Sequence, residues 1–152
     1  MIREQIRKAV NQAGKIGITA HIRPDGDAIG SVIALGLALR NANKDVQMVL
    51  RDGVSKTFRH LAGSELIQQK FEGDLDLYVV VDSSDLQRIG GVLNDHQADV
   101  CIDHHITNEK FAKLNLIDPQ SVATCAILAE LIPHLGLTID LDVANALLTG
   151  IL

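Results

Sequence analysis

The chain contains few aromatic and few basic residues. Aromatic side chains make up 3% of the 152 residues, and tryptophan is absent. Proteins that bind single-stranded nucleic acid by stacking need such rings, so this composition argues against a stacking platform. The formal net charge is −5, which argues against binding along a long nucleic acid, because such proteins carry a basic surface. The acidic balance remains compatible with short anionic substrates held by a metal ion.

Cysteines and long apolar stretches are also scarce. Cys101 and Cys125 lie in apolar segments without the spacing of a metal-binding pair. We expect them to be small core residues in a reducing compartment. The longest apolar stretch, Ala28 to Leu39, is shorter than the roughly 20 residues that span a bilayer. The charged N-terminal segment lacks a signal-peptide core. These features predict a cytoplasmic protein that does not associate with membranes.

The remaining composition, with 47% hydrophobic and 22% charged residues, is typical of one globular domain. Strands are predicted at 15–20, 45–50, 77–81, 99–102 and 114–117, and helices over the first dozen residues, at 29–40, at 121–135 and from 140 onward. Residues 51–73 are predicted to be a loop with a short helix at 56–61. Alternating strands and helices predict a three-layer α/β/α fold with a mainly parallel sheet covered on both faces.

Polar clusters directly follow three of the predicted strands. The segment from His21 to Ser31 (HIRPDGDAIGS) follows the first strand, Asp82 follows the third, and Asp103, His104 and His105 follow the fourth. Ligands of an open parallel sheet bind beyond the carboxyl ends of its strands. We therefore expect these clusters to meet in one crevice.

The residues that we expect to meet in this crevice are aspartates and histidines, which are common metal ligands. Four carboxylates in one crevice repel one another unless cations compensate them, and two divalent ions supply four positive charges. Oxygen and imidazole donors without cysteine favour manganese or magnesium, with iron, cobalt and zinc as competitors. Two metal ions are the usual device for attack on phosphorus. In isolation, Asp27 could be only a helix cap and Asp82 only a turn residue, but capping does not explain the paired histidines.

These motifs resemble those of the DHH phosphoesterase superfamily. The segment His21 to Ser31 resembles its first motif, Val80 to Asp82 its second and Ile102 to His105 its third. The form of the first motif is most similar to the bacterial group of oligoribonucleases and 3′-phosphoadenosine-5′-phosphate phosphatases. The resemblance implies hydrolysis of short oligoribonucleotides or 3′-phosphoadenosine 5′-phosphate at a binuclear centre, usually of manganese, with magnesium, cobalt or zinc as alternatives.

The resemblance also implies roles for individual residues. Asp103 would orient a metal ligand, and His105 would contact the scissile phosphate or assist the leaving group. The implied metal ligands are His21 and Asp25 for one ion, Asp27 and His104 for the other, and Asp82 as the bridge between them.

Two parts of the family pattern are absent from the chain. The segment Leu147 to Ile151 resembles the one that precedes the family's fourth motif, a metal-binding aspartate, and the chain stops one residue later. A second, DHHA-type substrate domain is also absent. We therefore expect residues 1–152 to be an incomplete DHH catalytic domain that is weakly active or inactive alone. A non-catalytic metal-binding remnant that forms homo-oligomers through its apolar end, and an inorganic pyrophosphatase or exopolyphosphatase, remain alternatives.

Three further side chains are candidates for binding phosphate. A guanidinium group suits phosphate geometry, which makes Arg23 a candidate and Arg88 a weaker one. Ser31, expected near a helix start, could bind an anion through its amide, with simple packing as the alternative. Ser121 is predicted to be the N-cap of the following helix.

Overall fold

A computed structural model describes all residues from Met1 to Leu152. Its helices are all too short or too polar to cross a membrane. The strands are β1 (Lys15–Thr19), β2 (Asp45–Val49), β3 (Leu77–Val81), β4 (Val100–Asp103) and β5 (Leu114–Ile117). The helices are α1 (Ile2–Gln12), α2 (Gly26–Asn41), α3 (Thr124–His134) and α4 (Leu141–Ile151), and short 3₁₀ turns lie at η1 (Lys56–Phe58), η2 (Ser64–Leu66) and η3 (Gln87–Ile89).

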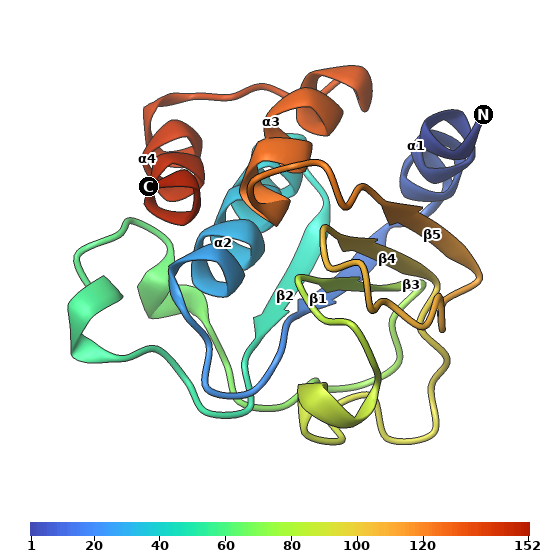
Figure 1. Cartoon of the computed structure of the whole chain (residues 1–152), viewed down its shortest axis with the longest axis horizontal. Coiled ribbons are helices and arrows are strands. Elements are labelled where there is room, and N and C mark those ends of the chain that lie inside the picture. The colour runs from blue at the N-terminus through green and yellow to red at the C-terminus, as the bar shows by residue number, and fades with distance from the viewer.

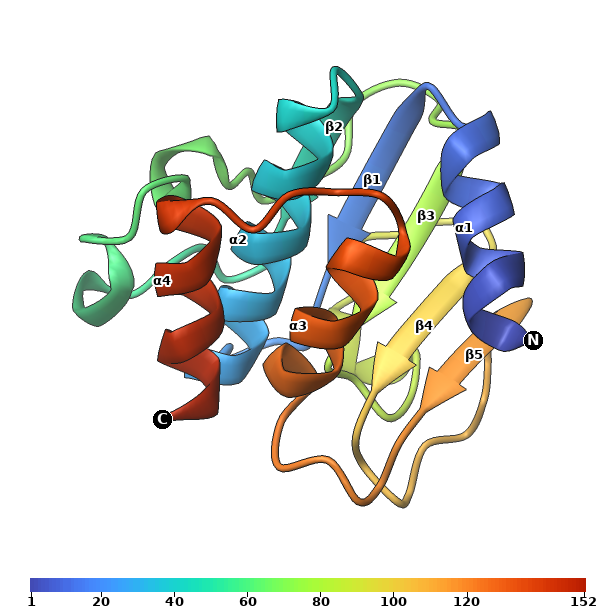
Figure 2. The ribbon, with the colours of Figure 1, turned by 90° about the horizontal axis from the view of Figure 1, so that it is seen from above.

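The five strands form one parallel sheet in the order β2-β1-β3-β4-β5, and Figure 2 shows the arrowheads of β1, β3, β4 and β5 at the same edge. After β2 the chain returns past β1 to form β3, so the direction of strand addition reverses between β1 and β3. Ligands of open α/β sheets bind at such a reversal, beyond the carboxyl ends of the strands.

The two faces of the sheet are covered differently. Alternate strand residues, such as Val79 and Val81, enter a core shared with all four α-helices, which lie together above the sheet in Figure 1. Tyr78 and Val80 point to the other face and pack in a smaller core around η3. The predicted α/β fold with a parallel sheet is confirmed, and the layer on the second face is built from loops and one 3₁₀ turn.

Helix α2 is the centre of the helical layer. Its residues from Ala28 to Leu35 are all buried, because the helix lies between the sheet and α4. Gly30 permits this close packing, since a Cβ there would clash with the backbone oxygen of Ala146 in α4. The packing fixes the beginning of α2, which carries Asp25 and Asp27.

The strands match their predicted positions to within one residue, whereas two helices begin elsewhere. Helix α2 begins at Gly26, three residues before the predicted Ile29, because the Asp25 side chain accepts a hydrogen bond from the Ala28 amide and caps it. The prediction of Ser121 as an N-cap is wrong. Helix α3 begins at Thr124 after Ala123, and the Ser121 hydroxyl instead donates to the Ala123 carbonyl oxygen.

Candidate metal centre

The three polar clusters meet at the carboxyl edge of the sheet. His21 follows β1, Asp82 follows β3, and His104 and His105 follow β4, three strands that are neighbours in the sheet. Two groups of side chains there could each hold a metal ion, and within each group the ligand atoms lie within 4.8 Å of one another. Both groups include Asp82.

The first group consists of His21, Asp25 and Asp82. His21 Nε2 lies 3.6 Å from Asp25 Oδ1 and 3.4 Å from Asp82 Oδ2. On the other side of the ring, His21 Nδ1 is 2.6 Å from the Ile22 carbonyl oxygen, so Nδ1 carries a proton. In the neutral imidazole Nε2 is then free to bind a cation, whereas in the protonated imidazolium Nε2 donates a hydrogen bond to Asp82. The hydrogen bond to Asp82 raises the pKa of His21 to about 9.

The second group consists of Asp82, His104 and His105. His104 Nε2 lies 3.6 Å from Asp82 Oδ1 and 3.4 Å from Asp27 Oδ2. His104 Nδ1 faces the Ser121 carbonyl oxygen at 3.3 Å, so this ring is oriented like His21, with Nε2 toward the shared carboxylate.

Asp27 has a second function in the structure. Its two carboxylate oxygens accept hydrogen bonds from the backbone amides of Thr124 and Cys125, each at 2.9 Å. These amides begin α3, whose N-cap residue Ala123 forms no side-chain cap. Asp27 therefore caps a helix that is distant in sequence. An ionised carboxylate offers about four acceptor positions, so this cap leaves lone pairs free on the side near His104.

Asp82 is the most buried carboxylate of the two groups. Its side chain is 2% exposed, compared with 68% for Asp25. Burial raises the pKa of Asp82, because the charged form loses its hydration. The Thr124 hydroxyl donates to Asp82 Oδ1 at 3.0 Å. The backbone of Asp82 adopts φ +55°, an uncommon conformation for a non-glycine residue, and one that is concentrated at functional sites.

His105 is oriented by a chain of buried polar groups. Its Nδ1 lies 2.6 Å from Asp103 Oδ1, and the Asp103 side chain is completely buried. Asn108 Nδ2 donates to Asp103 Oδ2 at 2.9 Å and to the Ser83 carbonyl oxygen at 3.1 Å. Asp103 thus orients His105, and Asn108 in turn orients Asp103.

The donor chemistry of the two groups fits divalent cations. The donors are carboxylate oxygens and imidazole nitrogens, with no thiolate, a set that suits manganese, magnesium, iron, cobalt and zinc. Both metal-facing imidazoles are held by backbone carbonyl oxygens on their other nitrogen, as is usual for histidine ligands. The carboxylates stand close together around one buried aspartate, which a cation would stabilise.

The other candidates lie in different surroundings. Arg23 is exposed and lines a cavity with His21. Ser31 is fully buried inside α2 rather than at its start, and its hydroxyl lies 3.3 Å from Cys125 Sγ. Ser31 therefore packs inside the domain instead of contacting substrate. Both cysteines are buried and unpaired, as predicted, and burial raises the pKa of the Cys101 thiol to about 12.

Sequence reasoning missed two residues that shape the centre, Thr124 and Asn108. Neither belongs to a motif, and each reaches its partner only through the fold. Thr124 lies 42 positions from Asp82 along the chain. Asn108 is five positions from Asp103, and its place in a polar segment gave no signal of a buried contact.

The fold and the clustered histidines and aspartates define a parallel α/β domain with a candidate binuclear metal centre. Residues 15–151 match the model of the DHH family, N-terminal domain. The chain therefore belongs to the DHH family.

Three known proteins illustrate the similarity. The chain is 35% identical over 151 residues to the bifunctional oligoribonuclease and PAP phosphatase NrnA of Thermus thermophilus, covering 97% of this chain and 45% of the relative. It thus spans about half the length of this curated relative. The crystal structure of an exopolyphosphatase-related protein from Bacteroides fragilis superposes with a TM-score of 0.87 at 24% identity, covering 98% of this chain and 48% of that one. The structure of exonuclease RecJ bound to manganese superposes with a TM-score of 0.54 at 17% identity, covering 96% and 40%.

Proposed function

We propose that this domain is the catalytic part of a metal-dependent phosphoesterase that hydrolyses short oligoribonucleotides, 3′-phosphoadenosine 5′-phosphate, or both. The observation that carries the proposal is the sharing of Asp82 by two metal-binding groups. Membership of the DHH family supports it, and the Thermus relative's printed activities suggest the substrates. Manganese is the proposed ion because the donor set suits it and a structural neighbour was solved with it.

The geometry of the side chains supports the proposed roles. His21 and Asp25 would hold one ion, His104 and Asp27 the other, and Asp82 both. When bound, such ions lower the pKa of water and neutralise charge on phosphoryl oxygens. Asp103 holds His105 by its Nδ1 atom, so the Nε2 atom remains available to a phosphate or a leaving group.

Hydrolysis of bis(p-nitrophenyl) phosphate, a triribonucleotide and 3′-phosphoadenosine 5′-phosphate with manganese tests the proposal. We expect turnover that Asp82→Asn abolishes and Asp74→Asn leaves unchanged, because Asp74 is 97% exposed and outside the centre. Turnover that survives Asp82→Asn would overturn the proposed mechanism. Absence of turnover would favour the alternative of a non-catalytic metal-binding domain.

A second candidate substrate is inorganic polyphosphate, suggested by the description of the Bacteroides structure as exopolyphosphatase-related. Its hydrolysis needs the same metal centre, so the substrate panel includes tripolyphosphate. We also propose that the working protein has a fourth metal-ligand motif and a DHHA-type domain. The substrate panel is therefore run both on residues 1–152 and on a longer form that carries these two parts.

A further inference from the structure

Three arginine side chains that line the cavities next to His21 have no acidic partner. Arg23, Arg59 and Arg88 are exposed, and the arginines that do form ion pairs, Arg3 and Arg7, lie on α1. In a chain of net charge −5, three unpaired guanidinium groups along one surface are a local positive feature.

The three arginines line two neighbouring cavities that share Arg23, and the first of these is also lined by His21. The first cavity, of about 370 Å³, is lined by His21, Ile22, Arg23 and Arg88. The second, of about 480 Å³, shares Arg23 with the first and extends to Arg59. We call these two cavities the arginine groove. Its one carboxylate, Asp52, already accepts a hydrogen bond from the Arg23 amide at 2.7 Å.

The backbone around each arginine is fixed while its charge remains available. The Ile22 amide, next to Arg23, donates to the Arg88 carbonyl oxygen at 2.5 Å. The Arg88 amide donates to Asp85 Oδ1 at 3.0 Å. Arg23 itself adopts φ +49°. This backbone conformation is unfavourable for a non-glycine residue and occurs most often at functional sites. Such anchoring lowers the backbone entropy that is lost when an anion binds.

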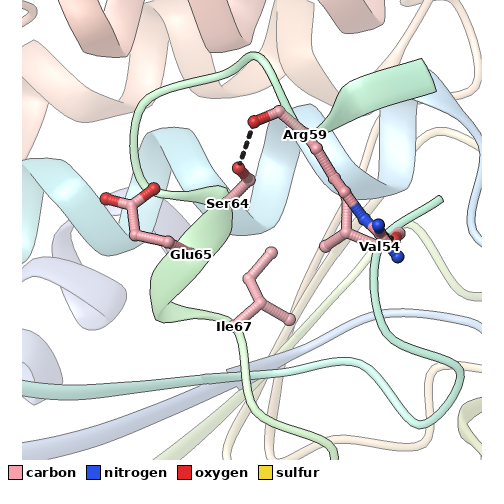
Figure 3. A pocket seen from close by; sticks show the side chains of 5 residues that line it. All are labelled: Val54, Arg59, Ser64, Glu65 and Ile67. Carbon is pink, nitrogen blue, oxygen red and sulfur yellow. Dashed lines mark hydrogen bonds between the residues drawn. The ribbon is translucent and has the colours of Figure 1, made fainter. Parts of the chain in front are cut away.

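Arg59 is held at the far end of the groove. Its Nε donates to the Val54 carbonyl oxygen at 3.2 Å, which leaves the terminal guanidinium nitrogens free. The buried Ser64 hydroxyl donates to the Arg59 carbonyl oxygen at 2.9 Å. A third cavity, of about 290 Å³, is lined by both Arg59 and Glu65. Figure 3 shows the Glu65 carboxylate pointing away from the Arg59 guanidinium, so positive charge gives way to negative charge beyond Arg59.

We infer that the arginine groove binds the phosphate groups next to the scissile phosphate of a short oligonucleotide. The inference rests on the proposed function, since the groove begins at His21. Arg23 and Arg88 stand nearest the metal centre and would bind the adjacent phosphate, and Arg59 the one beyond it. Guanidinium groups form charge-assisted, often bidentate hydrogen bonds with phosphate. Glu65 repels further phosphates, which favours short chains over long ones.

Binding of fluorescein-labelled di-, tri- and tetranucleotides, measured by fluorescence anisotropy in EDTA, tests the groove without turnover. We expect Arg59→Gln to weaken trinucleotide binding about 10-fold. The same substitution should reduce the slope of log K against log salt by about 0.7, the value for one lost phosphate contact. Arg88→Gln should weaken dinucleotide and trinucleotide binding alike. Arg7→Gln removes the same charge from α1, which contributes no residue to the groove, and should have no effect.

Equal affinities and salt slopes for Arg59→Gln, Arg88→Gln and Arg7→Gln would overturn the inference. Tighter competition by tripolyphosphate than by unlabelled trinucleotide would also overturn it, by assigning the groove to polyphosphate. Manganese-dependent hydrolysis of bis(p-nitrophenyl) phosphate, which has no second phosphate, reports on the proposed function separately. The control variant Arg7→Gln, outside the groove on α1, should leave that hydrolysis unchanged.

Discussion

Removing the His21 imidazole should change how the stability of the metal-free protein depends on pH. Folding raises the pKa of His21 from its ordinary 6.5 to about 9, chiefly because of its hydrogen bond to Asp82. A group whose pKa is raised by folding stabilises the protein fully below the unfolded pKa, and this stabilisation is lost as pH rises through the folded pKa. The His21 contribution is therefore present at pH 6.5 and gone above pH 9.

The size of this effect follows from the shift. At 1.36 kcal/mol for each pKa unit, the change from 6.5 to about 9 amounts to about 3 kcal/mol of unfolding free energy. The His21 side chain is 18% exposed, so solvent screens the interaction only in part, and this value is an upper limit.

Urea denaturation in EDTA at pH 6.5 and at pH 9.5 measures the loss. We expect the difference between the parent protein and His21→Gln to shrink by up to about 3 kcal/mol across this range. His60→Gln, which changes an exposed histidine outside the centre, should leave the parent's pH dependence unchanged. A difference between the parent and His21→Gln that is the same at both pH values would refute the coupling of His21 to Asp82.

Two further substitutions test the packing around the centre. Asn108→Ala removes a donor from the buried Asp103 carboxylate and should cost about 1–3 kcal/mol of unfolding free energy in urea titrations; an unchanged stability would contradict the proposed orientation of Asp103. Gly150→Ala would place a Cβ in collision with Cys125 Sγ and 3.0 Å from Asp27 Oδ1. It should cost about 1–3 kcal/mol and weaken manganese binding in calorimetry, whereas Gly14→Ala, with its nearest contact at 3.5 Å, should leave binding unchanged.

The sequence allowed the sheet to be predicted because its strands are short apolar segments, such as Leu77–Val81, each followed by a polar residue. The meeting of His21, Asp82 and His104 followed from one rule, that functional side chains gather at the carboxyl ends of parallel strands. Helix α2 begins earlier than predicted because Asp25 caps it. Asp25 and Asp27 are both suitable caps, and the local sequence does not decide between them.

Contacts between distant segments could not be predicted. Asp27 caps α3 from 97 positions away, and local rules assign a carboxylate only to the helix on which it lies. The prediction that Ser31 lies near the start of a helix was wrong for a related reason. Because α2 begins at Gly26, Ser31 lies in its second turn, and its hydroxyl contacts Cys125 of α3. Arg59 lies in a segment of weak pattern, and its position at the end of a groove depends on η1, η2 and the Ser64 hydrogen bond.

Manganese titration by calorimetry tests the central claim most directly, because Asp82 belongs to both metal-binding groups. We predict that Asp25→Asn weakens binding at one site, that His104→Gln weakens binding at the other, and that Asp82→Asn abolishes both. Manganese binding by Asp82→Asn that equals binding by the parent protein would contradict the shared centre.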